Sequence, residues 1–232
     1  MARKKPEGRM AALAEAALQQ FSQRGYRRTQ VADVANALDL SPGAVYGSVT
    51  SKEALFDLAV RAALDESIPE SDTPHVEPPL EELVERVKKM MRTSMRTPEM
   101  ARAVKRKEAP TDIRTELETL IREQYGMVSR NRRVIHLLDR CAADWPALSE
   151  LYLQRTRGGL FKRWASYLTR RIEMAALPPV PEPAIAGRLM IETIAWFGMH
   201  RHNEATPQLM EDDLARETVV TILLRGFGVQ EV

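Results

Sequence analysis

Between Thr29 and Lys52 the chain gathers side chains that can donate hydrogen bonds to an anionic surface. Hydroxyl groups and an ammonium group bind phosphate oxygens, and glycine lets a backbone approach a ligand closely. The chemistry that these residue types favour is non-covalent binding rather than catalysis. We predict that the binding residues are Thr29, Ser41, Pro42, Gly43, Ala44, Tyr46, Gly47, Ser48 and Lys52.

Two short helices joined by a tight turn must position these residues. The first has apolar residues at helical spacing, namely Val31, Val34, Ala35 and Leu38. The second begins at Ser41, whose hydroxyl can cap it, followed by Pro42 at the first helical position. It runs to about Val49, with only Val45 and Val49 facing inward. This pattern matches a helix-turn-helix, whose second helix enters the major groove of DNA.

We expect some of these residues to contact DNA bases and others to contact phosphates. We expect Ala44 to touch a thymine methyl group, and Tyr46 to reach a base or a phosphate unless its ring is part of the core. Gly43 and Gly47 let the backbone come close. The expected phosphate contacts are Thr29, Ser41, Ser48, Lys52 and Tyr26.

Flanking helices supply the small core against which these two pack. An apolar stripe predicts a helix over residues 8–23 that ends at Gly25. Thr50 and Glu53 have the spacing of a capping box, which predicts a fourth helix with Thr50 as its cap. Arg3, Lys4 and Lys5 either form an arm along a DNA groove or are disordered.

The run RGYRRTQVADVANALDLSPGAVYGSVTSKEALF resembles the N-terminal domain of the tetracycline-repressor (TetR) family of transcriptional regulators, over about residues 9–60. The resemblance implies DNA binding through that domain, followed by an all-helical ligand sensor that dimerises through a four-helix bundle. Two departures stand out. Asp39 replaces the usual glycine of the turn, and Gly47-Ser48-Val49 replaces an aromatic-rich pattern, which places the change at the base-reading surface.

The whole chain reads as all-α, without a strand pattern. We predict a three-helix DNA-binding domain over residues 1–66 and a larger helical ligand-binding and dimerisation domain over 80–232, separated by a proline-rich stretch. A helix from Ala184 to about His200 is apolar around most of its circumference and must be covered on more than one side. It forms either the dimer interface or the centre of a monomeric domain.

A pocket for a small-molecule effector is expected among the helices of the second domain. The chain has eleven methionines, whose flexible side chains suit a pocket that accepts varied shapes. Our candidate ligand contacts are Met91, Met95, Tyr125, Trp145 and Trp164. By the family resemblance, ligand binding would shift the fourth helix and change the separation of two recognition helices.

Several classes of protein are excluded or disfavoured. No phosphate-binding glycine loop or hydrolase motif is present, so we predict no enzyme and no cofactor. Cys141 is the only cysteine, which favours a reducing cytoplasm, and no apolar run is long enough to span a membrane. His200 and Glu204 share a helix face, but two residues make a weak metal site, and we predict none.

The sequence therefore predicts a ligand-responsive regulator, most simply a repressor that binds a palindromic double-stranded DNA operator as a homodimer and is released by a small molecule. A net charge of +2 does not decide the matter by itself. The alternative is a helical regulator that acts mainly through a protein partner and binds DNA weakly or non-specifically.

Overall fold

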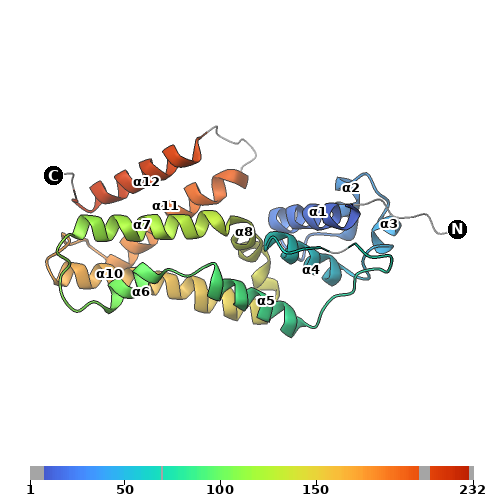
Figure 1. Cartoon of the computed structure of the whole chain (residues 1–232), viewed down its shortest axis with the longest axis horizontal. Helices are drawn as coiled ribbons and strands as arrows, with labels where there is room; N and C mark the ends of the chain where they lie inside the picture. Colours follow the sequence, from blue (N-terminus) through green and yellow to red (C-terminus); the bar gives the residue numbers. More distant parts are fainter. Residues whose placement is uncertain (1–7, 69, 204–209, 230–232) are drawn as a thin grey trace. The chain divides into compact units, whose positions relative to one another are not determined.

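The computed structural model describes residues 8–68, 70–203 and 210–229, and the regular elements in these ranges are helices (Figure 1). Their only β-type pairing is an isolated bridge between Val49 and His75. Arg3, Lys4, Lys5 and Glu204 lie outside the described residues. None of the described helices is both long enough and apolar enough to cross a membrane.

The first half of the chain contains α1 (Arg9–Arg24), α2 (Val31–Ala37), α3 (Pro42–Tyr46), α4 (Lys52–Ala63), α5 (Leu80–Thr93) and α6 (Pro98–Lys105). The second half contains α7 (Ile113–Arg130), α8 (Arg132–Cys141), η1 (Ala142–Asp144), α9 (Pro146–Leu148), the π-helical segment η2 (Ser149–Arg157), α10 (Gly158–Glu173), α11 (Pro183–Gly198), η3 (His200–Asn203) and α12 (Asp212–Gly226). The all-α prediction is thus confirmed.

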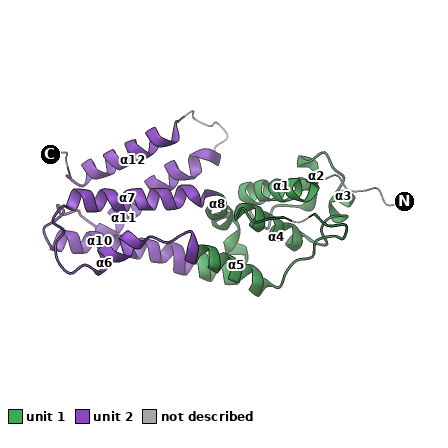
Figure 2. Cartoon of the chain, viewed as in Figure 1, with its two compact units in different colours: residues 1–91, 133–153 green, residues 92–132, 154–232 purple. Residues whose placement is uncertain are grey.

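The chain divides into two compact units (Figure 2). Unit 1 comprises residues 1–91 and 133–153, and unit 2 comprises residues 92–132 and 154–232. Each unit therefore takes its helices from two separate parts of the sequence. The functional division into residues 1–66 and 80–232 stays a prediction.

The core of unit 1 is formed where α1 packs on α4, with α2 and α3 beside them. Phe21 of α1 and Phe56 of α4 are fully buried and meet edge to face, with ring centroids 5.2 Å apart. Trp145 stacks on Phe56 at 5.5 Å and meets the ring of Tyr26 at 4.9 Å. This aromatic cluster ties the segment 133–153 to the first four helices.

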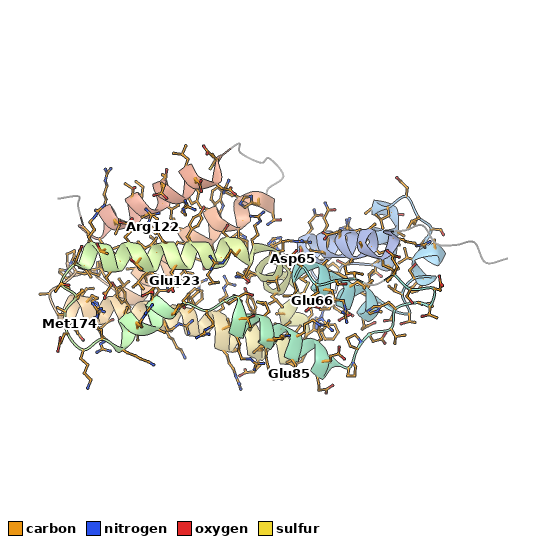
Figure 3. All side chains as sticks on the ribbon, in the orientation of Figure 1. Asp65, Glu66, Glu85, Arg122, Glu123 and Met174 are labelled. Atoms are coloured by element: carbon orange, nitrogen blue, oxygen red, sulfur yellow. The ribbon has the colours of Figure 1, made fainter. Side chains whose placement is uncertain are left out.

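Unit 2 is built around α7, α10, α11 and α12. Gly187 allows α10 and α11 to approach closely, because a Cβ atom there would lie 3.3 Å from the backbone of Ala165 and from the Trp164 side chain. Arg122 of α7 binds both carboxylate oxygens of Glu217 of α12 at 2.7 Å, and Figure 3 shows Arg122 on α7. The buried faces of these helices fill the interior, including Leu117, Ile121, Trp164, Leu168, Met190, Ile194 and Val219.

Two details of the predicted helices are wrong. The cap of α4 is Ser51, whose hydroxyl accepts a hydrogen bond from the Ala54 amide at 2.9 Å, whereas the Thr50 hydroxyl donates to the carbonyl of His75 at 3.2 Å. Thr50 is thus bound to His75 of the loop between α4 and α5, and the cap of α4 lies one residue later than predicted. The short second helix ends at Tyr46 rather than near Val49.

Candidate nucleic-acid interface

The turn between α2 and α3 forms as its residue types require. Asp39 adopts a left-handed conformation, with φ of 54°, at the position where the turn reverses the chain. The Leu40 amide then donates to the carbonyl of Ala35 at 2.9 Å. The Ser41 hydroxyl accepts from the Ala44 amide at 3.2 Å, and Pro42 follows as the first helical residue. The predicted helix start is therefore confirmed.

One face of α3 is held against unit 1, and the opposite face is open. Val45 and Val49 are fully buried, as predicted. The guanidinium group of Arg9 donates to the carbonyl of Ala44 and ties the helix to the start of α1. On the open side the Tyr46 side chain is 51% exposed, and no atom lies within 4 Å of a Cβ placed on Gly43. Tyr46 is therefore available to a partner molecule and is no core tyrosine.

Residues 75–77 of the loop between α4 and α5, called the strap from here on, bind the backbone just after the end of α3. The His75 amide donates to the carbonyl of Ser48 at 2.7 Å, and the Thr50 amide donates to the carbonyl of His75 at 2.9 Å. The Thr50 and Ser51 hydroxyls both donate to Glu77. The residue types of this stretch indicate only a proline-rich loop between two domains, because backbone hydrogen bonds do not depend on residue type.

The strap is anchored on its inner side by a buried charge. Asp57 of α4 is 1% exposed, and its carboxylate lies 2.9 Å from His75 Nε2 and 2.9 Å from Arg61 Nε and also pairs with Arg86 of α5. Burial alone would raise the pKa of Asp57, but hydrogen bonds from His75, Arg61 and Arg86 outweigh it and lower the pKa to about 2. The carboxylate is therefore ionised whenever the protein is folded near neutral pH.

Lys52 and Tyr26 lie together beside α3. The Lys52 ammonium lies 4.5 Å from the centre of the Tyr26 ring and 3.3 Å from the carbonyl of Arg27. The Tyr26 hydroxyl donates to Glu53 at 2.7 Å. Burial, followed by that hydrogen bond and the charge of Glu53, raises the pKa of Tyr26 far above its usual range. The phenol therefore stays neutral, and a phosphate that binds Lys52 meets no phenolate charge.

Thr29 and Ser48 lie inside unit 1. Both side chains are fully buried, and the Thr29 hydroxyl donates to the carbonyl of Gly25 at 2.8 Å. Neither hydroxyl reaches the surface, so the functional proposal rests on the other predicted residues. The exposed members of the predicted set are Ser41, Pro42, Gly43, Tyr46 and Gly47, with Ala44 and Lys52 partly exposed.

The five candidate ligand contacts are divided between the two units. Met91 and Trp145 belong to unit 1, and Met95, Tyr125 and Trp164 belong to unit 2. Trp145 packs against Tyr26 and Phe56, while the Tyr125 hydroxyl donates to the carbonyl of Phe197 at 3.3 Å. Trp164 is fully buried in unit 2. Ligand contact by these five residues stays a prediction.

Comparisons with known proteins agree with this geometry. Residues 13–59 match the family model described as bacterial regulatory proteins of the tetR family. This segment contains most of α1, all of α2 and α3, and most of α4. No curated protein matches the chain.

Three solved structures share the fold over nearly their full lengths. A probable transcriptional regulatory protein, RHA5900, is 17% identical with a TM-score of 0.54, covering 97% of this chain and 100% of its own. SCO3833, a TetR-family member from Streptomyces coelicolor A3, is 21% identical with a TM-score of 0.52, covering 99% and 94%. The ketosteroid regulator KstR2 of Mycobacterium tuberculosis is 19% identical with a TM-score of 0.51, covering 97% and 98%.

At these identities the solved structures establish the fold, whereas the family model identifies the helix-turn-helix segment itself. Together with the capped, open α3, the match over residues 13–59 identifies this segment as a helix-turn-helix domain of the kind found in TetR-family transcriptional regulators.

Proposed function

We propose that the protein is a repressor that binds a palindromic DNA operator as a homodimer and releases it when a small molecule binds. The observation that carries this proposal is the open face of α3. Tyr46 is half exposed beside Gly43 and Gly47, while Val45 fixes the opposite face in the core. A rigid, small-residue helix that presents one large side chain fits the major groove.

Phosphate binding would orient α3 in the groove. Ser41 and Lys52 flank the helix, and Arg28 adds exposed positive charge from the turn before α2, whereas the neighbouring Arg27 pairs with Asp144 at 2.9 Å. Phosphate contacts set the position of such a domain on the duplex, and base contacts set its sequence preference. Because Tyr46 is the only aromatic residue of α3, it is our first candidate for a base contact.

A second copy of the chain would cover exposed apolar residues of unit 2. Ile185 and Leu189 of α11 are 69% and 61% exposed, and Leu214 and Ile222 of α12 are 66% and 58% exposed. Large apolar side chains in such numbers favour a protein interface. A two-fold dimer would double the few base contacts of one short helix and place them on two half-sites.

Release would pass through α4. Ser51, the N-cap of this helix, lies five residues after Tyr46, the last residue of α3, and the strap binds Ser48, Thr50 and Ser51. A displacement of α4 would therefore carry α3 with it. In a dimer this would change the separation of the two α3 helices. Because the spacing of the two half-sites on the DNA is fixed, operator affinity would fall.

The test is selection of bound duplexes from a random pool, followed by titration of the selected sequence at several salt concentrations. We expect a palindrome that binds two chains, with affinity that falls steeply as salt rises. Binding that is weak and indifferent to sequence would contradict the proposal and would favour action through a protein partner.

A further inference from the structure

A polar groove lies in unit 2 between α6 and the first half of α7. It has a volume of about 400 Å³, and its base includes Ala103 and Leu120. This volume lies within the range of small-molecule sites. None of the five candidate ligand contacts lines it, so it is a separate site from the one that the sequence suggests.

The two walls of the groove are helix faces of different charge. Residues 99, 102, 103 and 106 have the spacing of one face of α6, and two of them are Arg102 and Arg106. Residues 112, 115, 116 and 119 have the same spacing on α7 and carry carboxylate and hydroxyl groups: Asp112, Thr115, Glu116 and Thr119. On the α6 side Arg102 pairs with Glu99 of the same helix, so Arg106 is the basic group that faces the carboxylates of α7.

The α6 wall is held in place at both of its ends. Glu123 of α7, which Figure 3 labels, accepts hydrogen bonds from the amides of Glu99 and Met100 at 2.8 and 2.9 Å and so fixes the start of α6. Arg170 of α10 donates to the carbonyls of Val104 and Arg106 at 2.6 and 3.1 Å and fixes its end. Hydrogen bonds to neighbouring helices thus fix the position of α6 at the groove.

Glu116 is the central acceptor of the acidic wall. Its side chain is 10% exposed, and its Oε1 accepts from Arg171 Nε at 2.7 Å and from the Tyr167 hydroxyl at 3.1 Å. Its Oε2 is buried and has no hydrogen bond, although Arg106 Nη1 lies 3.2 Å away as an ion-pair partner. A buried carboxylate oxygen without a hydrogen bond is costly, so this atom favours an added N–H donor.

Arg106 can exchange its partner without losing charge balance. Its side chain is 51% exposed, so a rotation into solvent costs little. The ammonium group of a ligand would then replace Arg106 as the partner of Glu116 Oε2, and a carboxylate of the same ligand would bind the released guanidinium group of Arg106. A ligand that carries only the ammonium group would leave Arg106 without an ion-pair partner, and a ligand that carries only the carboxylate would leave the Oε2 atom of Glu116 without one.

We propose that the groove between α6 and α7 binds a free α-amino acid, whose ammonium group pairs with Glu116 and whose carboxylate pairs with Arg106. The adjacent charges of an α-amino acid suit two protein groups that lie side by side, and its side chain would lie toward Ala103 and Leu120. That the bound amino acid is the effector rests on the proposed function.

The test is calorimetric titration of the full-length protein with each standard L-amino acid. We expect at least one to bind with a dissociation constant of about 1 mM or tighter. The N-acetyl and the carboxamide derivatives of that amino acid should each bind at least about tenfold more weakly, because each removes one charge. No heat from any amino acid up to about 10 mM would overturn the proposal.

Variants locate the binding site. Arg106→Gln should weaken binding at least about tenfold, whereas Lys105→Gln, an equal change of charge at an exposed neighbour outside the groove, should leave it unchanged. Arg106 is exposed, and circular dichroism will confirm that the variant folds. Equal binding by wild type and Arg106→Gln would place the amino acid elsewhere and overturn the proposal.

Operator titrations separate the two proposals. Loss of operator affinity on amino-acid binding would support both. Amino-acid binding without any change in operator affinity would leave the groove as a binding site and contradict its role as the effector site. Specific operator binding in a protein that binds no amino acid would overturn the groove proposal alone.

Discussion

Asp57 and His75 face each other inside unit 1, with 2.9 Å between the carboxylate Oδ2 and the imidazole Nε2. Through this contact the strap is joined to α4 by a side chain, and through the His75 backbone it is joined to the end of α3. His75 thus links α3 to α4, because its backbone bonds to Ser48 after α3 and its side chain bonds to Asp57 of α4. Asp57 is therefore expected to stabilise both unit 1 and the DNA-binding conformation.

Replacing Asp57 should destabilise the protein strongly. Asp57→Ala leaves Arg86, which is 11% exposed, and Arg61 without their buried partner, and removing one side of a buried pair costs about 3–5 kcal/mol. Glu82→Ala removes an exposed partner of the same Arg86 and should cost less than about 1 kcal/mol. Urea denaturation of both variants measures the difference, and equal losses would contradict the assigned role of Asp57.

The ionisation of Asp57 should also make the protein sensitive to acid. Its pKa falls from an ordinary value of 3.8 to about 2 on folding, so the folded state binds fewer protons than the unfolded state in this range. The resulting stabilisation is complete above about pH 4 and is lost as the pH falls toward 2. It amounts to roughly 2 kcal/mol.

Urea denaturation of wild type and Asp57→Asn between about pH 6 and pH 2 checks this contribution. This range includes the pKa of Asp57 in both the unfolded and the folded state. The free energy of unfolding of the wild type should fall more steeply below about pH 4 than that of the variant. Parallel curves would show that other carboxylates account for acid sensitivity.

The cap of α4 gives a third prediction. Ser51→Ala removes the acceptor of the Ala54 amide and should reduce the free energy of unfolding by about 1 kcal/mol. Thr50→Ala leaves that cap in place and should cost less. Thermal or urea denaturation distinguishes the two, and a larger loss for Thr50→Ala would restore Thr50 as the cap.

A fourth prediction concerns assembly. Leu189→Glu places a charge among the exposed apolar residues of α11 and should convert the proposed dimer to a monomer, because a buried unpaired charge is costly. Val76→Glu is the matched control, since Val76 is equally exposed at 61% but lies in unit 1. Light scattering during gel filtration measures the mass, and a Leu189→Glu dimer would exclude this face as the interface.

The local pattern of residues was sufficient to predict the helix-turn-helix. Ser41 and Pro42 specify where α3 begins and Val45 specifies its buried face, while Asp39 tolerates the left-handed backbone of the turn. Each signal acts within a few residues, which is the range over which sequence patterns are informative. The fold class followed for the same reason.

Other features depend on residues far apart in the sequence. The strap binds α3 through backbone atoms of His75, and Trp145 enters the aromatic cluster of helices that precede it by about a hundred residues. The groove in unit 2 sets the polar face of α7 from Asp112 to Thr119 opposite the face of α6 that carries Arg102 and Arg106. The sequence does not show this pairing, because only the tertiary fold sets those two helices side by side.

The central claim, that α3 reads DNA through its open face, is tested most directly by Tyr46→Ala in fluorescence-anisotropy titrations with the selected operator. Tyr46 is exposed and has no role in the core, so the variant should fold, and Gln23→Ala on the exposed side of α1 is the control. We predict at least about a tenfold loss of operator affinity for Tyr46→Ala, with binding to unrelated duplex nearly unchanged. Operator binding by Tyr46→Ala that equals wild type in affinity and sequence preference would contradict the claim.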